Sequence, residues 1–128
     1  MTINFSTGDI LNARKGSTAF HPIIYIGERN KDSFIGCIIT HSNNYDNIPM
    51  SQNHFEIHNT EGDFFNLQFD STFLVKAKLI KNLDLLPFEK VGELTEEGIK
   101  FITENIGAEY EKYWTKYLID SKTKRKNI

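Results

Sequence analysis

The sequence has few of the features that mark secreted, membrane-spanning or disulfide-rich proteins. It contains one cysteine in 128 residues, which excludes a framework of internal disulfides. No apolar stretch approaches the length of a membrane span, and the first residues do not resemble a signal peptide. These absences predict a cytoplasmic protein that does not enter a membrane.

An excess of charge of one sign is also missing. The net charge is -2, so no general basic field is present to hold nucleic acid. The exception is the stretch 121–128, which carries four basic residues and no acid. We expect it to be a disordered basic tail, although it could contact phosphates. Glycine-rich phosphate loops, nucleophile elbows and cysteine-based zinc spacings are absent from the sequence as well.

The remaining composition is typical of one folded domain. Hydrophobic residues make up 39% of the chain and aromatic residues 12%, which is enough to build a core. We expect a single domain over residues 1–120. Its pattern is β-rich in front and helical at the back, which predicts a mainly β (α+β) fold.

Apolar and alternating runs predict five strands. Residues 28–33 read as a charged turn that joins two of the strands into a hairpin, and 41–53 as a long polar loop. The stretch 34–40 is apolar throughout, so we expect it to be buried on both faces, with Cys37 as a small buried hydrophobe. The predicted strands span residues 8–13, 22–27, 34–40, 54–58 and 73–80.

The period of the apolar residues changes to that of a helix after Leu94. Thr95 can cap this helix, isoleucines recur at helical spacing from Ile99 to Ile106, and Gly107 is a plausible end. A second helix is predicted from Ala108 to about residue 119. Its stripe of aromatic residues favours a core or a dimer interface.

Polar residues with catalytic chemistry fall at the ends of two predicted strands. His21 precedes the strand 22–27, while Thr40, His41 and Ser42 follow from the strand 34–40. If these strands form an antiparallel hairpin, the four residues meet at one rim of the sheet. Two imidazoles can serve as general base and general acid near neutral pH.

Cations near this rim would complete a site for RNA cleavage. Arg14 and Lys15 precede His21 and could hold an anion there. Cleavage needs a base for the 2′-hydroxyl, an acid for the 5′-oxygen and donors for the phosphorane charge, but no metal or other cofactor. The alternative interpretation is that these are ordinary polar strand ends.

A second set of histidines offers a metal site. His54, Glu56 and His58 would share one face of the strand 54–58, and two histidines with a carboxylate can bind zinc. An exposed polar strand face has the same pattern, so both interpretations stay open.

Several short motifs occur in the order found in one toxin family. Gly8-Asp9-Ile10-Leu11, a Gly-containing loop, His21-Pro22-Ile23-Ile24-Tyr25-Ile26 and then Ile38-Ile39-Thr40-His41-Ser42 resemble the PemK/MazF-like toxins. The stretches 77–83 and 91–97 also resemble that family, the latter its entry into the last helix. The resemblance spans about residues 5–106.

This resemblance implies an SH3-like β-barrel with a C-terminal helix. Members are usually dimeric, metal-independent endoribonucleases that a small antitoxin neutralises, so it implies single-stranded RNA, an antitoxin and a possible second copy as partners. The catalytic threonine of the family corresponds to Thr40, and its catalytic arginine to His21. That departure implies either a reassigned mechanism with His21 as acid or base, or a loss of cleavage.

The sequence therefore leaves three hypotheses about function. One is a toxin-like endoribonuclease with His21, Thr40 and His41 as catalytic residues and Arg14, Lys15 and Ser42 as substrate-binding residues. Another is a non-catalytic SH3-like barrel that binds a protein or nucleic-acid partner. The last is a metal-dependent hydrolase built on His54 and His58.

Overall fold

The fold of this chain is described here from a computed structural model. It describes residues 5–13, 22–43, 46–65, 71–82 and 88–113. Within them lie eight strands, one short 3-10 helix and one α-helix. They are β1 (Asp9–Ala13), β2 (Ile23–Asn30), β3 (Ser33–Thr40), β4 (Ile48–Pro49), η1 (Gln52–His54), β5 (Phe73–Leu74), β6 (Lys78–Asn82), β7 (Phe88–Glu93), α1 (Glu96–Ile106) and β8 (Glu111–Tyr113).

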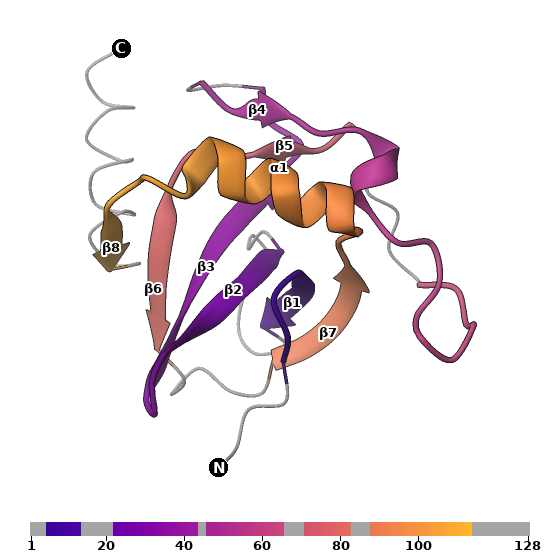
Figure 1. Ribbon diagram of the computed structural model, residues 1–128, viewed down its shortest axis with the longest axis horizontal. Coiled ribbons are helices and arrows are strands. Elements are labelled where there is room, and N and C mark those ends of the chain that lie inside the picture. The colour runs from indigo at the N-terminus through magenta and orange to yellow at the C-terminus, as the bar shows by residue number, and fades with distance from the viewer. Residues whose placement is uncertain (1–4, 14–21, 44–45, 66–70, 83–87, 114–128) are drawn as a thin grey trace.

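The strands form one mainly antiparallel sheet, and α1 lies across one of its faces (Figure 1). The order is β4-β5-β3-β2-β1-β7, and β6 pairs with β3 and β8. Strand β3 is central because it pairs with β2 along one side and with β6 and then β5 along the other. The mainly β prediction is confirmed, as is the hairpin of β2 and β3.

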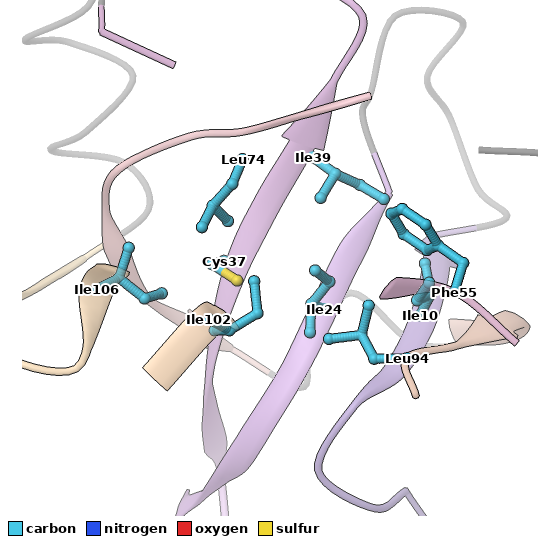
Figure 2. Close-up of a cluster of buried hydrophobic side chains, with 9 residues drawn as sticks. All are labelled: Ile10, Ile24, Cys37, Ile39, Phe55, Leu74, Leu94, Ile102 and Ile106. Atoms are coloured by element: carbon cyan, nitrogen blue, oxygen red, sulfur yellow. The ribbon is translucent and has the colours of Figure 1, made fainter. Parts of the chain in front are cut away.

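Strand β3 is buried along its whole length, as its apolar sequence predicts. Its alternate residues belong to different parts of the core, because successive side chains point to opposite faces. Cys37 and Ile39 face α1, where they pack with Ile24, Ile102 and other apolar residues (Figure 2). Cys37 is fully buried, which confirms its role as a small buried hydrophobe, and this burial raises the pKa of its thiol.

An aromatic cluster on the other face shows that the sheet is strongly curved. The ring of Phe34 on β3 lies 5.5 Å from the ring of Phe88 on β7, edge to face, and 5.3 Å from the ring of Tyr25. Three strand spacings separate β3 from β7, about 14 Å in a flat sheet. The sheet must therefore curl around these rings, although among the described residues it does not close into a barrel.

The predicted helix is confirmed in its position and in both ends. The Thr95 hydroxyl accepts a hydrogen bond from the Gly98 amide, and α1 ends at Ile106 with Gly107 as its C-cap. Gly107 keeps a right-handed conformation, and its carbonyl accepts a hydrogen bond of 2.8 Å from the Lys78 ammonium.

Three predicted elements differ in the structure. Strand β2 runs on to Asn30, so the turn is shorter than the predicted 28–33. The strand 73–80 is interrupted between Leu74 and Lys78: the Val75 amide still bonds the Ile38 carbonyl, but the Ala77 amide then bonds the Val75 carbonyl in a tight turn before β6 begins. The second helix is wrong over 108–113, where β8 pairs with β6 in parallel and contributes a further edge to the sheet.

The described part of the chain contains no helix that is long and apolar enough to cross a membrane. The predicted basic tail, 121–128, lies outside the described residues.

Candidate active site

The predicted rim begins where β2 and β3 end side by side. The Ile39 amide donates a hydrogen bond of 3.2 Å to the Pro22 carbonyl, so the start of β2 and the end of β3 meet as expected for an antiparallel hairpin. His21, Arg14 and Lys15 lie outside the described residues. Their predicted roles at this rim therefore stay predictions.

Thr40 is the last residue of β3 and is only 7% exposed. It pairs with Phe73 of β5, which covers this end of β3 from the side away from β2. The Thr40 hydroxyl oxygen accepts a hydrogen bond of 3.2 Å from the Ser42 amide. This bond turns the chain after the strand and carries His41 out to the surface.

His41 is exposed, and its ring is held in one orientation by the backbone. Its Nδ1 atom lies 3.3 Å from the Ser71 carbonyl oxygen. A carbonyl oxygen can only accept, so Nδ1 carries the proton in this bond, and Nε2 of the neutral ring keeps its lone pair. An imidazole with this tautomer can take a proton from a hydroxyl group at Nε2.

Ser42 anchors the loop that follows. Its carbonyl oxygen accepts a hydrogen bond of 2.9 Å from the Asn47 side-chain amide. Ser42 itself is half-buried, so part of its surface lies at the rim. The bond to Asn47 stabilises the polar loop against the end of β3.

Two residues with left-handed backbone lie next to these contacts. Ser71 has a φ of 50° and Asp46 a φ of 63°, a conformation that costs a residue with a side chain about 1–2 kcal/mol. Ser71 supplies the carbonyl that holds His41, and Asp46 precedes the Asn47 that holds Ser42. Such strained residues are common at functional sites because the surrounding structure must hold them in place.

The contacts of Ser71 and Asn47 were not predicted from the sequence. A backbone carbonyl has no sequence signature, and Ser71 lies 30 residues beyond His41. Asn47 belongs to a loop rich in asparagine and serine, where no pattern separates it from its neighbours.

The second set of histidines does not form a site. The predicted strand 54–58 is wrong because the chain forms η1 up to His54, and the His54 Nδ1 atom accepts a hydrogen bond of 3.1 Å from the Ser51 amide. The His54 ring packs on Phe101, whereas the His58 ring packs on Phe64. Across the described ranges, no three His, Cys, Asp or Glu side chains are grouped to hold a metal ion.

A charged cluster lies elsewhere, between β1 and β7. The Lys90 ammonium lies 3.1 Å from a carboxylate oxygen of the buried Asp9 and also bonds Glu93. Partial burial lowers the pKa of Lys90, but the hydrogen bonds and charges of these two carboxylates raise it by more. This cluster of one ammonium and two carboxylates joins the two strands.

Comparison of the chain with protein-family models, with curated proteins and with solved structures finds no match. The residues at the rim therefore carry the functional argument alone.

Proposed function

We propose that this chain is a metal-independent endoribonuclease of the toxin type, which cleaves single-stranded RNA at the rim formed by Thr40, His41 and Ser42. The observation that carries the proposal is the bond between the His41 ring and the Ser71 carbonyl, which leaves Nε2 as the proton acceptor. The curved sheet around Tyr25, Phe34 and Phe88 supports an SH3-like barrel of the PemK/MazF type as the scaffold.

In this mechanism His41 takes the proton of a ribose 2′-hydroxyl through Nε2. The 2′-oxygen then forms a bond to phosphorus, and the bond from phosphorus to the 5′-oxygen breaks. A second group must protonate the departing 5′-oxygen, and we assign this role to His21. The products are a 2′,3′-cyclic phosphate and a 5′-hydroxyl.

Thr40 and Ser42 have supporting roles in the proposal. The Thr40 hydroxyl accepts from the Ser42 amide, so it holds the turn that presents His41. The proton of the Thr40 hydroxyl would stabilise charge on the phosphorane, and Ser42 is proposed to bind the substrate beside it. Arg14 and Lys15 are proposed to bind the phosphate, and a small antitoxin protein to control the activity.

The test is cleavage of single-stranded RNA by the pure protein in the presence of a chelator. We expect His41→Ala to lower the cleavage rate by about 10²–10⁴-fold, the usual contribution of a general base. His21→Ala should lower it similarly, and loss of the acid should be partly rescued by an RNA with a better leaving group. His58→Ala is the matched control, because His58 is exposed and lies outside the rim, so its rate should equal that of the unmodified protein.

No cleavage by the unmodified protein, or equal rates for His41→Ala and His58→Ala, would refute the proposal. The function would then be the second candidate, a non-catalytic barrel that binds a partner. The observation in its favour is that Thr40 is buried, which limits its contact with a substrate. A stoichiometric partner, together with growth that is unaffected by expression of the protein, would support this candidate.

A further inference from the structure

Residues 55–65 form a hairpin that projects from the sheet beside η1 (Figure 1). His58 and Phe64 pair across it, and the Phe65 amide donates a hydrogen bond of 3.1 Å to the Ile57 carbonyl. Its turn is held by the Asn59 side chain, which accepts hydrogen bonds from the amides of Glu61 and Asp63. The hairpin is thus an ordered projection with a closed turn.

This hairpin exposes two large apolar side chains, one on each face. Ile57 is 67% exposed and Phe64 is 71% exposed. The Phe64 ring packs against the His58 ring with a tilt of 40° and 4.2 Å between the ring centres, which orients it without burying it. Because neighbouring residues of an extended strand point to opposite sides, Ile57 and Phe64 present apolar surface on both faces of the hairpin. Aromatic side chains are enriched at interaction sites, and Phe64 is an ordered, exposed side chain of this kind.

The charges around these side chains identify the kind of partner. Glu56, Glu61 and Asp63 are exposed on the hairpin, and the segment 55–65 contains no lysine or arginine. Three carboxylates repel the phosphates of nucleic acid, and they would also repel the same hairpin of a second copy. They attract a segment that carries lysine or arginine.

We propose that the hairpin 55–65 is a docking element for a basic, partly apolar segment of a partner protein. The apolar side chains of the segment cover Phe64 on one face of the hairpin, and Phe64 provides most of the binding energy as a buried anchor. Its cations lie against the three carboxylates at the rim of the contact and speed association. This docking is independent of RNA cleavage, because none of the residues involved lies at the rim of Thr40 and His41.

The test uses the full chain labelled with ¹⁵N and a short synthetic peptide that alternates lysine and leucine. Titration should shift the amide resonances of residues 56–65 selectively, and added salt should weaken the effect because it screens the charges. The matched peptide in which glutamate replaces lysine should cause no shifts.

Variants separate docking from general attraction to an acidic protein. Phe64→Ser should weaken binding by about tenfold, whereas Ile57→Ser, on the opposite face, and Glu61→Lys should each weaken it by a smaller factor. The matched control is Tyr110→Ser, because Tyr110 is 90% exposed but lies away from the hairpin, and it should bind the peptide unchanged. All of these side chains are exposed, so the fold should persist in each variant.

Three results would overturn the proposal. One is the absence of any shift, and another is a set of shifts centred on the acids of α1 instead of the hairpin. The last is a dimer of the free protein that Phe64→Ser dissociates, which would make a second copy the occupant.

Discussion

At the scale of single residues, Gly98 shows how closely two segments far apart in the sequence approach. It lies in the first turn of α1 and is buried against η1. A Cβ added there would lie far inside the contact distance of the His54 carbonyl oxygen and 3.0 Å from the Leu94 Cβ. The same carbonyl accepts a hydrogen bond from the Thr95 amide, so it cannot move without loss of that bond.

We therefore expect Gly98→Ala to destabilise the protein, although alanine is the better helix former. The cost of forcing η1 away from α1 should be about 1–3 kcal/mol in the free energy of unfolding, measured in urea. Gly27→Ala is the control, because a Cβ at Gly27 meets nothing within 4 Å. Equal stability of the Gly98→Ala variant and the unmodified protein would show that η1 does not pack on α1 in this way.

His41 is the second residue whose role depends on its contacts. Its place after an apolar strand predicted that it lies at the rim, and the structure agrees. Its tautomer depends on the Ser71 carbonyl, which the chain brings back through β5. The sequence could therefore propose His41 as a catalytic residue, but only the tertiary structure indicates which ring nitrogen carries the proton.

At the scale of elements, α1 is fixed at its start by two different bonds of one side chain. The Thr95 hydroxyl accepts from the Gly98 amide and donates to the Asn53 carbonyl at 2.7 Å. The first bond caps the helix, and the second ties the cap to η1. The sequence predicted the cap, whereas the link to Asn53 exists only in the folded chain.

We expect Thr95→Ala to lower the free energy of unfolding by about 1–2 kcal/mol, the upper part of the usual range for a cap, because both bonds are lost. Thermal and urea unfolding measure the change. Thr103→Ala provides the comparison, since the Thr103 hydroxyl bonds only the Ile99 carbonyl within the helix, and its effect should stay within about 0.5 kcal/mol. If the two variants lost the same stability, the cap would have no special role.

The elements that were predicted wrongly share one cause. Residues 54–58 alternate as a strand does, but the Ser51 amide bonds the His54 ring and the chain turns there instead. Residues 108–113 have residue types that favour a helix, but β6 offers them an edge to pair with. In both cases a contact with residues elsewhere outweighed the local preference.

At the scale of the whole molecule, we expect the stability of the curved sheet to depend on pH. The groups involved are Lys90, its partners Asp9 and Glu93, and Tyr25. Lys90 joins β7 to Asp9 of β1 and has a pKa raised above its ordinary value of 10.5. Burial first, and then the charges of Glu28 and Asp9, raise the pKa of Tyr25 above its ordinary value of 10.0.

Both groups hold their protons more tightly in the folded chain than in the unfolded chain. The unfolded chain therefore loses protons first as the pH rises, and the stability present below about pH 10 is lost above it. We expect the free energy of unfolding to fall through this range, and to fall less steeply in Tyr25→Phe, which removes one of the two protons. Urea unfolding at a series of alkaline pH values measures both slopes, and identical slopes would contradict the assignment to Tyr25.

The sequence by itself determined the class of the fold, the hairpin of β2 and β3, the buried course of β3 and both ends of α1. These follow from local periodicity and from capping residues, which act over a few neighbouring positions. Only the tertiary structure decided the curl of the sheet, the pairing of β8 with β6, the separation of His54 from His58 and the bond that orients His41. Each of these depends on groups brought together from distant parts of the chain, and several of those groups are backbone carbonyls, which every residue has and no residue type reveals.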